Sequence, residues 1–151
     1  MSSTISILTE EEKKLLIEQA LNAQLNSYCP YSNFAVGAAI LNSDGEIFKG
    51  VNVENASYGG TICAERSAIC SAISAIGSKK FCPKGLCVTT NLPYPAAPCG
   101  ICRQVLAEFG DYPILLYSTK TKDLNITSIS ELLPMGFSKK DIDKHEQMNK
   151  E

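Results

Sequence analysis

Two short segments contain the residues whose types and spacing could do chemistry: Cys63-Ala64-Glu65 and Pro98-Cys99-Gly100-Ile101-Cys102. Cys99 and Cys102 lie three residues apart at the predicted start of a helix, so both sulfurs can reach one ion. Side chains of a first helical turn tilt toward the N-terminus, where unpaired N–H groups and the helix dipole favour thiolate over thiol. Because Zn²⁺ binds thiolates well, the pair indicates a zinc site.

Cys63 offers a third thiolate at the start of another predicted helix, and Glu65 follows two residues later. Both side chains can reach a target that lies ahead of the helix end, so Cys63 can hold a metal while Glu65 faces the ligand opposite it. Three protein ligands leave one tetrahedral position for water, which is typical of catalytic zinc. Three thiolates also weaken the ion as a Lewis acid, so a cation is expected nearby, and Arg66 and Arg103 are the nearest in sequence.

A structural zinc site or a redox pair is the alternative, because Cys-x-x-Cys is common in both. A structural site usually has four protein ligands, and Cys29 and Cys82 are the best candidates for the fourth. Cys70 lies about two helical turns after Cys63, too far along the helix to share its metal. Cys87 falls in a predicted core strand, where cysteine usually packs as a small hydrophobe.

The elements that must position these segments follow from apolar periodicity. Thr9 and Glu12 form a capping-box pattern at the start of a predicted helix over residues 10–26. The order of predicted elements is α-β-β-α-β-α-β-β, which favours an α/β fold with one mixed sheet covered by helices on both faces. The further strands are predicted at 34–41, 46–54, 86–90, 112–118 and 123–127, and the further helices at 62–77, 99–109 and 130–133.

The composition is that of one globular domain: 44% of the residues are hydrophobic, 20% are charged, and the formal net charge is −2. Such a balance offers no basic field to a polyanion, so nucleic acid is not an expected partner. We find no apolar run of about 20 residues and no secretory signal, so we expect no membrane partner and a cytoplasmic location. In a reducing compartment the seven cysteines are expected to be thiols or metal ligands.

We find no internal repeat and no interdomain linker. Residues 1–151 are therefore predicted to form a single domain, with a core over about 10–137 and a charged tail over 138–151. The tail is expected to fray or to project, and its His145, the only histidine, is interpreted as solvated.

Five longer stretches extend the two motifs: Pro30-Tyr31-Ser32-Asn33-Phe34-Ala35-Val36-Gly37-Ala38-Ala39, Gly50-Val51-Asn52-Val53-Glu54-Asn55-Ala56, Cys63-Ala64-Glu65-Arg66, Pro98-Cys99-Gly100-Ile101-Cys102-Arg103-Gln104-Val105, and Glu131-Leu132-Leu133-Pro134 with Phe137. In this order they resemble the small homotetrameric zinc-dependent cytidine deaminases, from about residue 10 to 140. The deaminase zinc signature is present in its three-cysteine form. The resemblance implies a three-layer α/β/α sandwich with a five-stranded mixed sheet, one Zn²⁺ per chain, and a homotetramer.

The resemblance also implies a reaction: hydrolysis of cytidine and deoxycytidine to uridine and deoxyuridine with release of ammonia, in pyrimidine salvage. Glu65 would move protons between a zinc-activated water, N3 of cytosine and the departing amine. The zinc ligands would be Cys63, Cys99 and Cys102. Arg66 would hydrogen-bond the thiolates, and Gln104 would be an outer donor.

Substrate contacts are implied in the same way. Asn52 and Glu54 match residues that hydrogen-bond the ribose, the backbone of Ala64 would help to read the pyrimidine, and Phe34 would pack against the base. Phe137 would close the site from a neighbouring subunit. Without the resemblance, Asn52 and Glu54 are alternate positions on one face of a strand, facing solvent, and the two phenylalanines are a core residue and a tail anchor.

One departure and two functional alternatives stay open. Gly59-Gly60 is richer in glycine than the family pattern and could loosen the entry to the helix that carries Cys63. The same zinc chemistry could act on another aminopyrimidine such as blasticidin S, or on a cytosine in RNA, although the nearly neutral charge disfavours RNA. A non-catalytic zinc or redox module is the second alternative.

Overall fold

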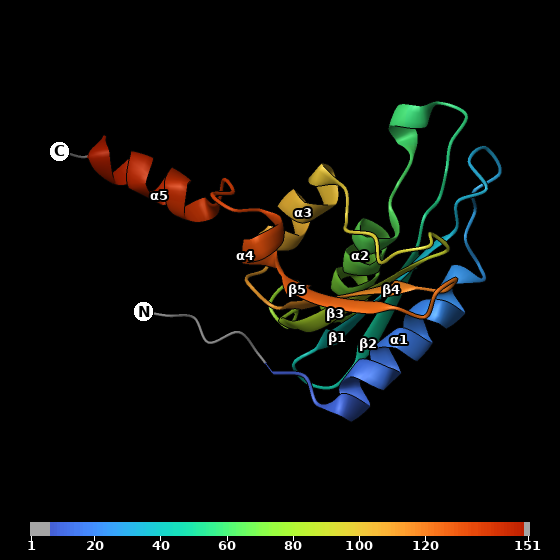
Figure 1. The fold of residues 1–151 in the computed structure, drawn as a ribbon. Coiled ribbons are helices and arrows are strands. Elements are labelled where there is room, and N and C mark those ends of the chain that lie inside the picture. Colours follow the sequence, from blue (N-terminus) through green and yellow to red (C-terminus); the bar gives the residue numbers. More distant parts are fainter. Residues whose placement is uncertain (1–6, 150–151) are drawn as a thin grey trace.

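The computed structural model describes residues 7–149, which form a five-stranded sheet with helices on both faces (Figure 1). The strand order is β2-β1-β3-β4-β5. The strands are β1 (Val36–Asn42), β2 (Ile47–Val51), β3 (Pro83–Thr90), β4 (Pro113–Ser118) and β5 (Leu124–Ser128). Strands β3 and β4 run parallel and the other neighbours are antiparallel, so the sheet is mixed, as predicted.

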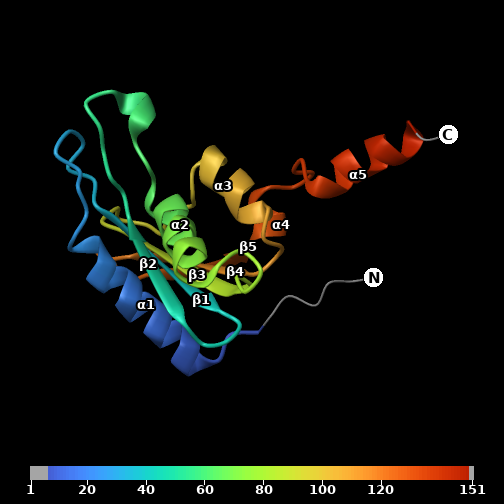
Figure 2. The ribbon, with the colours of Figure 1, turned by 180° about the vertical axis from the view of Figure 1, so that it is seen from behind.

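The helices make the outer two layers. They are α1 (Glu10–Gln24), α2 (Ala64–Ile76), α3 (Gly100–Ala107), α4 (Ile129–Leu132) and α5 (Lys139–Met148), with a 3₁₀ turn at Tyr58–Gly60. Helix α1 covers one face of the sheet, and α2 and α3 cover the other, as the view from behind also shows (Figure 2). The predicted α/β/α sandwich is therefore confirmed.

Strand residues alternate between the two cores because successive side chains point to opposite faces. The core under α2 and α3 receives Ala38, Ile40, Leu86, Val88, Ile114 and Leu116. The core under α1 receives Ala39, Leu41, Cys87 and Leu115 together with Leu16 and Ala20 of the helix. Cys87 is fully buried there, which agrees with its interpretation as a small hydrophobe.

Two glycines let the helices lie close to the sheet. A Cβ at Gly50 of β2 would stand 2.2 Å from the Ala68 nitrogen and 2.3 Å from the Ala64 oxygen of α2. A Cβ at Gly37 of β1 would stand 2.1 Å from the Ala20 oxygen of α1. Distances this short exclude any side chain, so glycine at 50 sets where the first turns of α2 lie above the strand.

The ends of the helices follow the predicted signals. Thr9 and Glu12 form the capping box, with the Thr9 nitrogen donating to Glu12 Oε2 at 2.9 Å and the Glu12 nitrogen donating to Thr9 Oγ1 at 3.1 Å. At the entry to α2, Val53 and Ile62 pair through two backbone hydrogen bonds of 2.9 and 3.0 Å. The glycine-rich stretch between them is therefore held at its base and does not loosen the helix entry.

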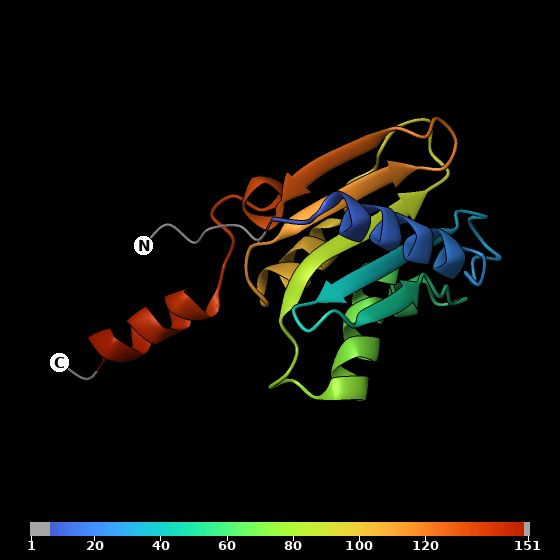
Figure 3. The same ribbon diagram turned by 90° about the horizontal axis from the view of Figure 1, so that it is seen from below.

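The charged tail projects, as predicted, but it is helical over most of its length and does not fray there. Residues Lys139–Met148 form helix α5, which starts where the Ser138 nitrogen donates to Asp141 Oδ2 at 2.8 Å. The helix extends away from the sheet and buries no residue (Figure 3). His145 is exposed, as expected, with its Nε2 3.0 Å from Asn149 Nδ2. Within residues 7–149 no helix is long and apolar enough to cross a membrane.

Candidate metal centre and active site

Three sulfurs meet between the first turns of α2 and α3. The Sγ atoms of Cys63, Cys99 and Cys102 all lie within 4.8 Å of one another, and those of Cys63 and Cys99 are 3.8 Å apart. Two sulfurs bound to a tetrahedral zinc at 2.3 Å are separated by about 3.8 Å, so the spacing fits this ion. In the part of the chain that the structure describes, no other group of three or more possible ligand atoms converges in this way.

Backbone geometry at the two helix starts aims the thiols at one point. Cys63 is the N-cap of α2 and Cys99 is the N-cap of α3, and both have extended backbone angles. Neither side chain caps its own helix, so each sulfur is available to a ligand. Cys102 lies one turn into α3 and is fully buried. The predicted convergence of two helix ends is therefore present, and Cys29 and Cys82 do not join it.

Of the two arginines that lie next to the motifs in the sequence, only one lies beside the sulfurs and can offset their negative charge. Arg66 Nη2 lies 3.7 Å from Cys63 Sγ and also donates to the Thr61 carbonyl at 3.3 Å. Arg103 instead donates to the carbonyls of Pro98 and Leu132, at 2.7 and 3.0 Å. Arg103 thus ties the start of α3 to α4, and Arg66 is the cation beside the sulfurs.

Contacts within the cluster favour the ionised form of the Cys63 sulfur, whereas the contact with Cys63 and burial raise the pKa of Cys102. The neighbouring Cys102 thiol and the Arg66 guanidinium lower the pKa of Cys63 to about 5. The same contacts raise the pKa of Arg66, so the guanidinium stays charged. A thiolate at neutral pH, beside a fixed cation, is the form in which cysteine binds a metal.

Glu65 is a buried carboxyl beside the sulfurs. It is the second residue of α2, and its side chain is 4% exposed. Burial raises its pKa, and the negative charge of Cys63 raises it further. A raised pKa lies closer to neutral pH, at which the carboxyl can then both accept and release a proton.

A cavity of about 370 Å³ opens in front of these groups. Its wall brings together the start of α2, the start of α3, the loop before β1 and the residues that follow β2. The predicted site residues in this wall are Phe34, Asn52, Glu54, Cys63, Ala64, Glu65 and Cys99. The others are Ser32, Val36, Thr61, Val88, Thr90, Ala96 and Ala97.

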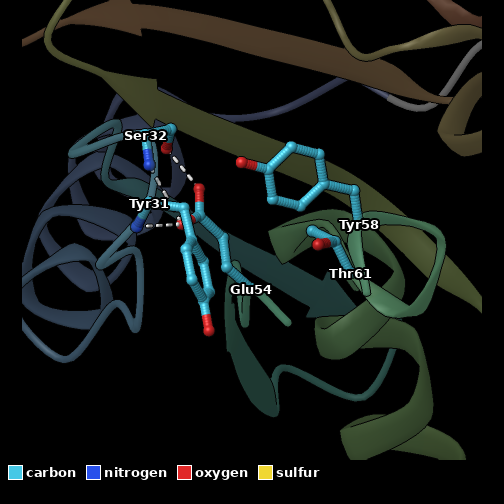
Figure 4. Close-up of a pocket in the computed structure, with 5 residues that line it drawn as sticks. All are labelled: Tyr31, Ser32, Glu54, Tyr58 and Thr61. Carbon is cyan, nitrogen blue, oxygen red and sulfur yellow. Dashed lines mark hydrogen bonds between the residues drawn. The ribbon is translucent and has the colours of Figure 1, made fainter. Parts of the chain in front are cut away.

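Asn52 and Glu54 hold the loop before β1, so the solvent-facing alternative is wrong for Asn52, which is 7% exposed. Asn52 Oδ1 accepts from the Val36 nitrogen at 2.8 Å, and its Nδ2 donates to the Phe34 carbonyl at 2.8 Å. Glu54 Oε2 accepts from the nitrogens of Tyr31 and Ser32, at 2.9 and 3.2 Å (Figure 4). The two residues that the resemblance places at the ribose thus also fix this loop.

A smaller cavity of about 200 Å³ adjoins the first and shares Ser32, Glu54 and Thr61 with it. Tyr31 and Tyr58 complete its wall, with ring centroids 6.0 Å apart (Figure 4). The sequence patterns alone predict no role in the site for Ser32 or Thr61. Ser32 lies within the stretch 30–39 that carries the resemblance, and Thr61 lies two residues before Cys63.

Phe137 and Gln104 lie away from the cavity of their own chain. Phe137 is 62% exposed and follows α4. Gln104 Nε2 donates to the Phe137 carbonyl at 2.8 Å, so this amide orders the segment after α4. Neither residue lines the cavity.

Three cysteine sulfurs at two helix starts, next to a buried glutamate that is not among them, define the site of the zinc-dependent deaminases that act on cytosine or adenine. Comparisons with known proteins agree with this class. Residues 10–118 match the family model described as "Cytidine and deoxycytidylate deaminase zinc-binding region". The chain therefore belongs to the cytidine and deoxycytidylate deaminase family.

Individual relatives cover most of the chain. It is 45% identical over 136 residues to a probable cytidine deaminase of Dictyostelium discoideum, covering 89% of this chain and 90% of that protein. It is 44% identical over 128 residues to a cytidine deaminase of Sporosarcina psychrophila, covering 84% and 92%. A crystal structure of cytidine deaminase from Burkholderia pseudomallei superposes with a TM-score of 0.77 at 43% identity, covering 86% of this chain and all of that one.

Proposed function

We propose that this chain hydrolyses cytidine and deoxycytidine to uridine and deoxyuridine with release of ammonia, using one Zn²⁺ held by Cys63, Cys99 and Cys102. The observation that carries the proposal is the three-sulfur cluster with a buried, non-ligating Glu65 at the base of a cavity. The proposal includes one domain over residues 1–151 with its core at about 10–137, and a role in pyrimidine salvage in a reducing cytoplasm, where thiolates persist.

A nucleoside fits the cavity better than a nucleotide does. The residues that line the two adjoining cavities include the carboxyls of Glu54 and Glu65 and no lysine, arginine or histidine. A 5′-phosphate would meet two acidic groups and the thiolates with no cation among these lining residues, and such juxtaposition of like charges is costly. The same acidic wall disfavours RNA.

Glu65 moves the protons in the proposed mechanism. When bound, zinc supplies a Lewis acid that makes water a nucleophile near neutral pH. Glu65 would accept one proton from the attacking water and deliver it to N3 of the cytosine ring, as the water oxygen bonds to C4. Glu65 would then take the second proton from that oxygen and pass it to the amino group, so that the C4–N bond breaks and ammonia leaves. The burial of Glu65 keeps the pKa of the carboxyl high enough for both directions of transfer. Phe34 packs against the base, and the backbone of Ala64 reads its edge.

Ultraviolet-monitored conversion of cytidine by the zinc-loaded protein, with and without a chelator, tests the proposal. We expect cytidine and deoxycytidine to be converted, the chelator to abolish turnover, and CMP to react at least about tenfold more slowly because of the acidic wall. A panel with free cytosine, blasticidin S and a cytosine-containing RNA discriminates the alternatives. A zinc-loaded protein that leaves both nucleosides intact would contradict the proposal.

We also propose that the chain forms a homotetramer in which Phe137 closes the cavity of a neighbouring subunit. What supports this is that Phe137 is 62% exposed and outside its own cavity, while Gln104 fixes its backbone. Four chains of 16.3 kDa give about 65 kDa, which sedimentation equilibrium measures directly. We expect Phe137→Ala to raise KM for cytidine by about tenfold, since a buried aromatic contact is lost. A monomer at micromolar concentration would contradict the assembly.

A further inference from the structure

The hydroxyl of Ser32 joins two walls of the cavity. It donates to Glu54 Oε1 (Figure 4). It also accepts from the Phe34 nitrogen at 3.0 Å. Glu54 and Phe34 both line the cavity, and they come from different parts of the chain. One small side chain thus connects the carboxylate to the backbone of the aromatic residue.

The hydrogen bonds of Glu54 leave room for one more donor. An ionised carboxylate offers about four acceptor positions. The nitrogens of Tyr31 and Ser32 occupy those of Oε2, and the Ser32 hydroxyl occupies one position of Oε1. One acceptor position of Oε1 therefore remains for a ligand. The three donors already set the orientation of the Glu54 carboxylate, which lines both cavities.

The loop is shaped to present these donors. Asn33 adopts a left-handed conformation with φ of 53°, which asparagine tolerates better than most residues. The Asn33 nitrogen donates to the Cys29 carbonyl at 2.9 Å, which closes the turn. The two preceding nitrogens then face Glu54. The hydrogen bond from the Ser32 hydroxyl, followed by those from the two nitrogens, lowers the pKa of this carboxyl.

We propose that Ser32 is a positioning residue, which orients Glu54 to accept a hydrogen bond from a sugar hydroxyl of the nucleoside and couples it to Phe34 against the base. The proposal rests on the nucleoside substrate proposed above. Ser32 itself does not touch the reacting atoms. Its effect should therefore appear in binding of the sugar and not in proton transfer by Glu65.

The test compares two sugars in two variants. For Ser32→Ala we expect KM for cytidine to rise about fivefold with kcat within about twofold, because water competes for an exposed hydrogen bond. For 2′,3′-dideoxycytidine, which lacks both sugar hydroxyls, KM should change by less than about twofold. Ser32→Thr keeps the hydroxyl and should restore the KM for cytidine, and Ser74→Ala, an exposed position on α2, serves as the matched control.

A merely structural role of Ser32 would raise KM equally for both sugars, and an unchanged KM for cytidine would equally overturn the inference. To separate it from the proposed function, both sugars are titrated calorimetrically into the Glu65→Gln protein with and without Ser32→Ala. A fivefold loss of affinity confined to cytidine supports the role of Ser32 even if the unmodified protein turns over no cytidine. Failure of the Glu65→Gln protein to bind cytidine, or equal losses for the two sugars, overturns it.

Discussion

Replacing Glu65 with glutamine is expected to lower kcat for cytidine by about 10²–10⁴-fold, the range that general acid–base catalysis contributes, while the protein keeps its zinc. Glutamine has nearly the shape of glutamate, so the 4% exposed site should remain filled. An amide cannot carry the proton that the raised pKa of Glu65 makes available. Glu65→Ala should lose at least as much turnover and also retain the metal, because Glu65 is not one of the three clustered ligands.

Kinetics and metal analysis on the same preparations measure this result. Glu46→Gln is the matched control, because Glu46 is exposed in the turn between β1 and β2, away from the cavity. The control should have wild-type kcat and zinc content. A Glu65→Gln protein with full activity would remove this residue from the mechanism, and one that loses zinc would make Glu65 part of the metal site.

Local signals in the sequence were enough to predict the framework that carries this carboxyl. The capping box at Thr9 and Glu12 acts over three residues, and short apolar runs within 34–41, 86–90 and 112–118 predict the central strands. The cysteines at two helix starts also followed from local patterns. Each of these features depends on residues that are close together in the chain.

Features that depend on tertiary contacts could not be predicted in the same way. Arg66 and Arg103 are equally adjacent to the two motifs, and only the fold turns one toward the Cys63 sulfur and the other toward the carbonyls of Pro98 and Leu132. The hydrogen bonds by which Asn52 holds the segment before β1 join residues 16 to 18 positions apart along the chain. Sequence spacing contains no information about such contacts.

Helix α5 shows a different limit. Its first turn has a capping pair, Ser138 with Asp141, and an ion pair between Lys139 and Asp143 at 2.5 Å. These signals are present in the sequence, but the stretch offers few apolar residues, so its pattern predicts a tail and no packed helix. The helix is stabilised by local polar contacts and contributes nothing to the core, so apolar periodicity could not reveal it.

Replacing Cys99 with alanine is expected to remove zinc and activity together. Cys99 is exposed and fills no core space, so its loss tests the metal and not the packing, whereas Cys102 is fully buried and its removal would also leave a cavity. One of three ligands is lost from a site whose binding free energy, by comparison with structural zinc, is about 10–16 kcal/mol, so the dissociation constant should rise more than about 10²-fold.

Cys82→Ala is the matched control, because Cys82 is also an exposed free thiol but lies outside the cluster. Metal analysis after gel filtration should find zinc in the control and almost none in Cys99→Ala, and the melting temperature of Cys99→Ala should no longer respond to added zinc, because a ligand stabilises only the fold that binds it. If the Cys82 variant lost its zinc, Cys82 would be a fourth ligand. The site would then be structural, and the metal would serve folding and not catalysis.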